Sequence, residues 1–259
     1  MLLTLDYETY FASDYHLGKG SKISTSEFIR DARFKAHGAS AKIDDQPGIW
    51  VRHDRLHDFL ATIPWAETTL LCHHTFFDGL ILKEHYGIVP GKYACTLSMS
   101  RAFHQGEVGN GLAELLPFHG HGQKGTDLHE MKGIRDLTDE QDHKLGIYAI
   151  TDAEGTYKLY QDFLPHFSAE ELELIDLSHR MFCDPILEVD VARATVAHGI
   201  ELQERADAVA ATGVGAKALG SNPQFAKLLE DCGITVPMKL SPKTGKQTYA
   251  FAKNDLGFQ

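Results

Sequence analysis

Short apolar segments of strand length alternate with amphipathic segments of helical length in the first part of the chain, and this alternation constrains the fold most. Residues 2–5 and 68–72 form continuous apolar or β-branched runs, which are typical of buried strands. Residues 53–63 and 76–86 carry apolar side chains at helical spacing. Strands and helices that alternate in this way predict an α/β fold.

The character of the sequence changes after residue 168. Ser168-Ala-Glu-Glu171 is a capping box, which marks the beginning of a helix. Helical patterns then follow over 169–182, 191–211 and 222–232, in the order of the chain. We therefore predict a first domain over residues 1–168 and a mostly helical second domain over residues 169–259.

The chain is acidic, with 25 Lys+Arg against 36 Asp+Glu and a formal net charge of −11. This excludes binding of nucleic acid by bulk positive charge, although it leaves local binding through metal ions open. The sequence shows neither a signal-peptide pattern nor a run of about 20 apolar residues. We therefore expect a cytoplasmic protein without membrane contact, in which the four scattered cysteines are reduced.

Two carboxylates follow the first predicted strand. Asp6 and Glu8 are two positions apart, so on a strand they point to the same face. Close carboxylates repel each other unless a cation lies between them, and hard divalent cations prefer oxygen ligands. The pair indicates either a metal site or an exposed acidic strand end.

Two further motifs carry acidic side chains. Asp78 follows the second apolar run at the beginning of a helix, where it is either a buried ligand or a residue favoured by the helix dipole. Tyr148 and Asp152 share one face of a helix expected from the cap Thr138 to about Phe163. The simpler interpretation of that pair is a core tyrosine and a solvated aspartate. Gly155 in this helix costs about 1 kcal/mol relative to alanine, which indicates a close approach there.

The ordered set of motifs resembles the DEDD superfamily of 3′–5′ exonucleases, and Tyr148 marks its DEDDy branch. The histidine branch would place a histidine five residues before the last aspartate, where this chain has Ile147. The resemblance implies a ribonuclease H-like exonuclease domain, with a mixed central sheet flanked by helices. It also implies that four carboxylates act as metal ligands and that Tyr148 joins them in catalysis: Asp6, Glu8, Asp78 and Asp152.

A closer resemblance is to the proofreading exonuclease domain of family A, DNA polymerase I-like enzymes of the phage type. Ala94–Ala102 is similar to the family's helix after the second motif, and Leu187–Asp190 to the beginning of its polymerase domain. Asn222–Glu230 and Ser241–Gly245 resemble the base of the thumb. The resemblance implies a complete exonuclease domain and a truncated start of a polymerase domain. The setting would be a bacterial host or a phage-infected cell.

This resemblance also implies a mechanism. Two divalent ions, Mg²⁺ or Mn²⁺, would bind the carboxylates, and Glu8 and Tyr148 would orient the attacking water. The substrate would be a single-stranded or frayed DNA 3′ end, the partner would be the missing polymerase portion, and the product a nucleoside 5′-monophosphate. Thr9, His74 and Phe77 are the expected contacts of the nucleic acid, although the family often has asparagine where His74 stands. Basic residues beside the third motif could guide the strand: His119, Lys124, His129, Lys132, Arg135, His143 and Lys144.

Two alternatives remain open. An RNA-trimming exonuclease of the ribonuclease D type would carry the same motifs. A nuclease-like module without activity would only bind DNA or a replisome partner, but the presence of all four carboxylates and Tyr148 argues against it.

Overall fold

The computed structural model describes residues 1–18, 20–125, 129–242, 244–255 and 257. The chain divides into two compact units, Met1–Leu187 and Glu188–Gln259. Among the described residues, no helix combines the length and the apolar composition needed to span a bilayer.

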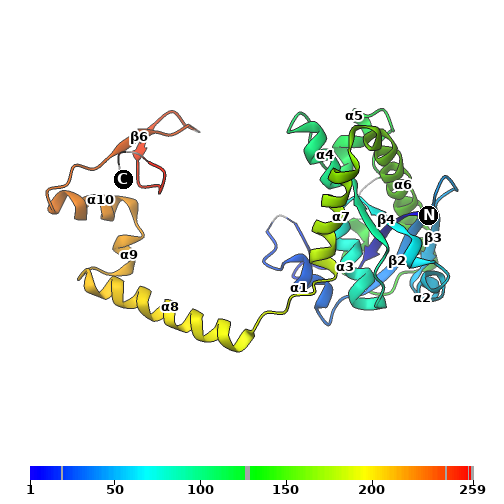
Figure 1. The fold of residues 1–259 in the computed structure, drawn as a ribbon, viewed down its shortest axis with the longest axis horizontal. Helices are drawn as coiled ribbons and strands as arrows, with labels where there is room; N and C mark the ends of the chain where they lie inside the picture. The colour runs from blue at the N-terminus through cyan, green and yellow to red at the C-terminus, as the bar shows by residue number, and fades with distance from the viewer. Residues whose placement is uncertain (19, 126–128, 243, 256, 258–259) are drawn as a thin grey trace. The chain divides into compact units, whose positions relative to one another are not determined.

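The first unit is built on a five-stranded mixed sheet in the order β3-β2-β1-β4-β5 (Figure 1). β1 pairs antiparallel with β2 and parallel with β4, while β2–β3 is antiparallel and β4–β5 is parallel. Because β1 and β4 run in the same direction, their C-terminal ends meet at one edge of the sheet. The strands are β1 (Leu2–Thr9), β2 (Ala36–Ile43), β3 (Ile49–Arg52), β4 (Thr69–Cys72) and β5 (Lys92–Cys95).

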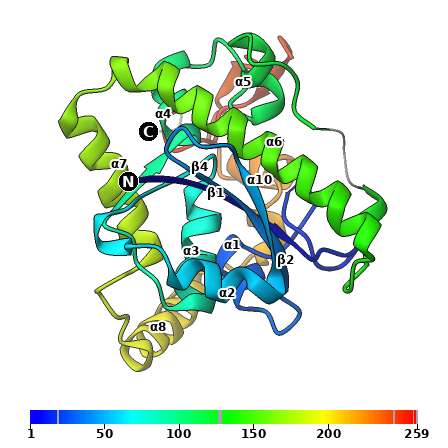
Figure 2. The ribbon, with the colours of Figure 1, turned by 90° about the vertical axis from the view of Figure 1, so that its right-hand side faces the viewer.

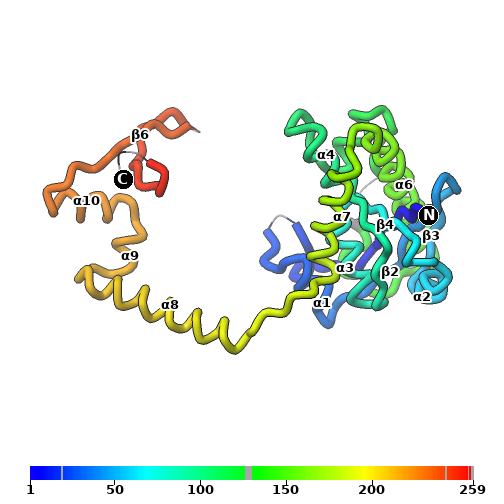
Figure 3. The backbone as a smooth tube through the Cα atoms, in the orientation of Figure 1, coloured from blue at the N-terminus to red at the C-terminus, as the bar shows by residue number. Residues whose placement is uncertain are grey.

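Helices cover this sheet. Figure 2 shows α6 crossing one face, and the chain then reverses direction into α7, as the backbone trace in Figure 3 makes clear. The α-helices are α1 (Thr25–Arg30), α2 (His53–Ala61), α3 (Thr75–Tyr86), α4 (Thr96–His104), α5 (Leu112–Phe118), α6 (Asp139–Phe163) and α7 (Ala169–Cys183). Short 3₁₀ helices lie at Trp65–Glu67, His129–Met131 and Leu164–His166.

The central strand β1 separates a hydrophobic core from a polar face. Leu3, Leu5 and Tyr7 are 0%, 0% and 4% exposed and belong to the main core cluster. Asp6 and Glu8 alternate with them and therefore point to the other face, which α6 covers. The strand thus carries its acidic side chains on the face opposite the core.

The structure confirms the predicted α/β class, the mixed sheet and several helix boundaries. Capping boxes are present at Thr138 with Gln141 and at Ser168 with Glu171. α1 is short and ends at Arg30, because Asp31 already has extended backbone angles. β2 and β5 were not predicted, and β5 occupies the first residues of the segment Ala94–Ala102.

The division into units falls after Leu187, whereas the sequence places the boundary at residue 168. α7 packs on the first unit: Asp176 Oδ1 accepts a hydrogen bond of 2.7 Å from the amide of Tyr93 on the edge strand β5. Cys183 at the end of α7 is fully buried in the main core cluster. The functional identity of the two predicted domains stays a prediction.

The second unit is mostly helical, with a small hairpin. Its helices are α8 (Val191–Ala211), α9 (Ala216–Leu219) and α10 (Asn222–Asp231). The antiparallel pair β6 (Met238–Leu240) and β7 (Gln247–Tyr249) follows them. Asp190 caps α8, since its carboxylate accepts a hydrogen bond of 2.9 Å from the amide of Arg193.

Substitution of Gly155 should destabilise the first unit. A Cβ atom at this position would lie 2.7 Å from Leu116 Cδ2, so α5 and α6 approach closely here, as the sequence indicates. We expect Gly155→Val to lower the free energy of unfolding by about 1–3 kcal/mol through overpacking. Thr151→Ala, on the exposed face of the same helix, should change it by less than about 1 kcal/mol. Urea denaturation followed by circular dichroism measures both, and equal effects would contradict the close packing.

Candidate active site

The first motif lies in the last part of β1. Asp6 and Glu8 flank Tyr7, and the register between β1 and β2 shifts between Glu8 and Thr9. The two carboxylates therefore sit side by side on the face below α6, where the ladder with β2 ends. This arrangement is the one that the spacing of Asp6 and Glu8 predicts.

Asp78 comes to the same edge from the first turn of α3. Its side chain is 3% exposed, and Oδ1 accepts a hydrogen bond of 3.0 Å from the backbone amide of Tyr7. The parallel ladder between β1 and β4 ends at the pair Thr4 and Leu71, so this amide lies beyond it. A buried amide without a partner is costly, and Asp78 supplies the acceptor while it joins the second motif to the first.

α6 brings the third motif over the sheet. Tyr148 and Asp152 lie one turn apart on this helix, and the Asp152 side chain is 4% exposed. Asp152 Oδ2 forms an ion pair of 2.9 Å with Nζ of Lys124. The charge of Asp152 contributes to the electrostatic potential at both Asp6 and Glu8. The structure therefore brings the three motifs together.

The surroundings of this cluster disfavour the ionised forms of its carboxyl groups. Burial, together with the charges of Glu8, Asp78 and Asp152, raises the pKa of Asp6 well above its usual value. Burial and the neighbouring Asp152 raise the pKa of Glu8 to about 8, and burial raises the pKa of Asp78 to about 7. Burial also raises the pKa of Asp152, which Lys124 partly opposes. The one ammonium group of Lys124 thus faces four buried or partly buried carboxyl groups.

The donor atoms of the cluster fit a hard divalent cation. Asp6 Oδ2 and Asp152 Oδ1 are buried and have no hydrogen-bond partner within the described residues. Carboxylate oxygens of this kind are the ligands that Mg²⁺ and Mn²⁺ prefer. Within the described ranges, no three acidic, histidine or cysteine side chains already surround a common point. The cluster therefore offers free carboxylate oxygens from Asp6 and Asp152 rather than a group of three converging side chains.

No protein-family model and no curated protein matches the sequence. Among solved structures, NrnC of Brucella melitensis is similar with a TM-score of 0.50 at 14% identity, over 71% of this chain and 82% of that one. RNase D of Trypanosoma brucei in complex with RNA U12 is similar with a TM-score of 0.50 at 16% identity, over 73% and 66% of the two chains. At such identities the likeness concerns the fold alone. The sheet and its helices form a ribonuclease H-like fold.

The three expected nucleic-acid contacts occupy different positions on this fold. Thr9 is half-buried at the end of β1, and His74 is exposed at the N-cap of α3. Phe77 is partly buried against the main core, with its ring 6.1 Å from that of Phe28. Thr9 and His74 flank the acidic cluster in sequence, whereas Phe77 contributes to the core. Their contact with nucleic acid stays a prediction.

Several basic residues of the stretch beside the third motif lie next to acidic side chains, and the role of the stretch in guiding a strand stays a prediction. Lys124 pairs with Asp152, and Lys144 Nζ lies 3.2 Å from Glu140 Oε1. His119 Nδ1 lies 3.1 Å from Asp162 Oδ2. The side chain of His129 lies outside the described part. The place of Lys124 beside the acidic cluster was not predicted, because its ion pair with Asp152 joins two segments far apart in the sequence.

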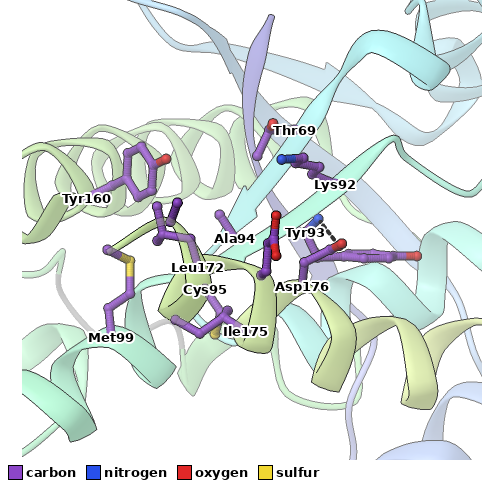
Figure 4. A pocket seen from close by; sticks show the side chains of 12 residues that line it. Thr69, Lys92, Tyr93, Ala94, Cys95, Met99, Tyr160, Leu172, Ile175 and Asp176 are labelled. Carbon is purple, nitrogen blue, oxygen red and sulfur yellow. Dashed lines mark hydrogen bonds between the residues drawn. The ribbon is translucent and has the colours of Figure 1, made fainter. Parts of the chain in front are cut away.

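A cavity of about 270 Å³ lies elsewhere on the same unit, between β5, α4, α6 and α7. Figure 4 shows its lining, with Tyr160 and Met99 on one side and Asp176 hydrogen-bonded to the amide of Tyr93 on the other. None of the four carboxylates of the cluster lines this cavity. The cavity is therefore separate from the acidic cluster.

The raised pKa values in the acidic cluster lead to a prediction of how the stability of EDTA-treated protein depends on pH. The pKa values of Glu8 and Asp78 in the folded state, about 8 and about 7, lie above their usual values of 4.5 and 3.8. The folded state then binds these protons more tightly than the unfolded state, so stability present at low pH is lost as the pH rises. We expect the melting temperature to fall between about pH 5 and pH 8.

Thermal melts of wild type and Glu8→Gln measure this effect. The variant has no proton to lose at that position, so its melting temperature should fall less over the same pH range. Parallel curves for the two proteins would contradict the assignment of the pH dependence to this cluster.

Proposed function

We propose that the first unit is a metal-dependent 3′–5′ exonuclease that removes nucleoside 5′-monophosphates from single-stranded 3′ ends. The observation that carries the proposal is the convergence of three motifs from β1, α3 and α6 on one edge of the sheet. The ribonuclease H-like fold supports it, since nucleases such as NrnC and RNase D share that fold.

Two divalent ions are the proposed cofactors. Asp6, Glu8 and Asp152 would hold one ion, and Asp6 with Asp78 would hold the other. Bound in this way, such ions stabilise the attacking and the leaving oxygen of an in-line displacement at phosphorus. They would also supply the positive charge that the buried carboxylates lack. The unpartnered Asp6 Oδ2 and Asp152 Oδ1 support this assignment.

Tyr148 and Glu8 would position the attacking water. Burial raises the pKa of Tyr148 above its usual value of 10, so the phenol stays protonated at neutral pH and its hydroxyl can donate a hydrogen bond. The Glu8 carboxylate, once ionised, accepts a hydrogen bond from the same water. A donor and an acceptor together fix the orientation of the water towards the terminal phosphodiester. Thr9 and His74 would contact the terminal nucleotide.

Two classes of nucleic acid are candidate substrates. RNA is supported by the solved RNase D with the same fold, whose structure contains the RNA U12. DNA is supported by the resemblance of Leu187–Asp190 and Asn222–Glu230 to the polymerase portion of family A enzymes. In the second case the unit would proofread for a polymerase that the second unit begins. The comparisons favour RNA, and the resemblance of the second unit rests on sequence alone.

Digestion of end-labelled oligonucleotides tests the proposal. With Mg²⁺ or Mn²⁺, wild type should shorten a single-stranded substrate from its 3′ end. Asp6→Ala and Asp152→Asn should lose about 10³-fold or more in rate, because several kcal/mol of charge stabilisation disappear with the ligands. Asp139→Asn is the matched control, since this exposed carboxylate lies on the same helix and pairs with Arg52.

The outcomes separate the candidate functions. Equal rates for wild type and Asp6→Ala would overturn the exonuclease assignment, and binding without cleavage would favour an inactive module. DNA and RNA of the same sequence in the same assay distinguish proofreading from RNA trimming, because each function predicts a faster rate on its own substrate.

Tyr148→Phe tests the positioning of the water. Loss of one preorganised hydrogen-bond donor should lower kcat about 10²-fold. Affinity for Mn²⁺ should stay unchanged, because the proposed ligands remain. Tyr160→Phe, on the same helix but at the separate cavity, should retain full activity. Full activity of Tyr148→Phe would show that the Tyr148 hydroxyl has no part in the mechanism.

A further inference from the structure

Lys124 places an ammonium group inside the acidic cluster. Its Nζ lies 2.9 Å from Asp152 Oδ2, and the two side chains are 32% and 4% exposed. The same nitrogen lies 5.3 Å from the centre of the Tyr148 ring. Its charge also acts favourably on the ionised forms of Asp6 and Glu8. One lysine therefore serves as a cation for three carboxylates.

The backbone beside Lys124 is packed against the site. A Cβ atom at Gly125 would lie 2.7 Å from Tyr148 Cδ2, so the chain passes very close to this ring. A glycine is needed where the backbone approaches so closely. Packing of this segment, in addition to charge attraction, thus brings Lys124 to Asp152.

Another lysine pair on α6 provides a contrast. Lys144 pairs with Glu140 at 3.2 Å, but the two side chains are 49% and 81% exposed. Such exposed pairs contribute little because water screens them. The partner of Lys124 is instead buried, and removal of one member of a buried pair leaves an uncompensated charge.

We propose that Lys124 is a built-in counter-ion of the acidic cluster, which holds Asp152 until a divalent ion replaces it and which therefore opposes metal binding. The inference rests on the proposed function, because it takes Asp152 as a metal ligand. An ammonium group and a divalent ion close to the same carboxylate repel each other. The ion therefore binds more tightly when Lys124 withdraws from Asp152 Oδ2, and the partly exposed lysine side chain can move into solvent.

This role explains two properties of the site together. Lys124 lowers the electrostatic cost of gathering buried carboxylates in protein without bound ions. It also occupies Asp152 Oδ2, one of the carboxylate oxygens that an ion would need. Lys124 is a positioning residue in this account, since it acts through Asp152.

Direct measurement of Mn²⁺ binding tests the inference, by electron paramagnetic resonance of free Mn²⁺ on the full chain without nucleic acid. Lys124→Gln and Lys124→Met should both bind Mn²⁺ about tenfold more tightly than wild type. Lys144→Gln is the matched control, since it removes the same charge from an exposed pair, and its affinity should equal that of wild type. A merely structural role for Lys124 would weaken Mn²⁺ binding.

Thermal melts add a second readout that activity does not influence. In EDTA, Lys124→Gln should melt at a lower temperature than wild type, because the carboxylates lose their cation. Saturating Mn²⁺ should raise its melting temperature by more than it raises that of wild type. A variant that is merely damaged would stay below wild type by the same amount in both conditions.

The outcomes also separate this inference from the proposed function. If Asp6→Ala abolishes Mn²⁺ binding while both Lys124 variants bind no more tightly than wild type, the counter-ion role is overturned and the metal site stands. If Asp6→Ala binds Mn²⁺ as wild type does, or none of the proteins binds it, the metal site itself fails and the inference fails with it.

Discussion

The structure of the first unit depends on the two covered faces of β1. The strand lies in the middle of the sheet, so Leu3, Leu5 and Tyr7 pack into the core on one side. The alternation of a strand then forces Asp6 and Glu8 to the other side, where α6 covers them. The carboxylates are therefore shielded from bulk water by the same geometry that builds the core. The free-energy cost of burying their charges follows directly from the fold.

The fold offsets the free-energy cost of burying these carboxylates only in part. Asp78 accepts the Tyr7 amide, which places one carboxylate without leaving that amide unpaired. Lys124 neutralises Asp152, but a single ammonium group cannot balance four acidic groups. Burial, together with the repulsion between the carboxylates, therefore raises the pKa values of Asp6 and Glu8, which favours their protonated forms. The site therefore lowers the stability of the protein without bound ions and raises its affinity for cations. The ammonium group of Lys124 reduces both effects.

The sequence predicts the parts of this site that local rules determine. Strand alternation places Asp6 beside Glu8, and helical spacing places Tyr148 beside Asp152. The cap Thr138 and the capping box at Ser168 locate the first turns of α6 and α7. The remaining features depend on contacts between distant segments. β2 contains small residues and a glycine rather than a β-branched run, so only its pairing with β1 and β3 makes it a strand. The ion pair of Lys124 with Asp152 follows from no local pattern.

The boundary between the units shows why a local signal is not sufficient. Ser168 and Glu171 begin a new helix, which from the sequence alone suggests a new domain. However, β5 is an edge strand, and its exposed amides need acceptors. Asp176 on α7 accepts from the Tyr93 amide, Arg180 donates to the Gly91 carbonyl, and Cys183 fills the space above Gly79, where an added Cβ would lie 2.9 Å from its sulfur. A helix whose side chains bond with the edge strand of a sheet is part of the same domain as that sheet. The capping box at Ser168 therefore marks the turn between α6 and α7 and not a domain boundary.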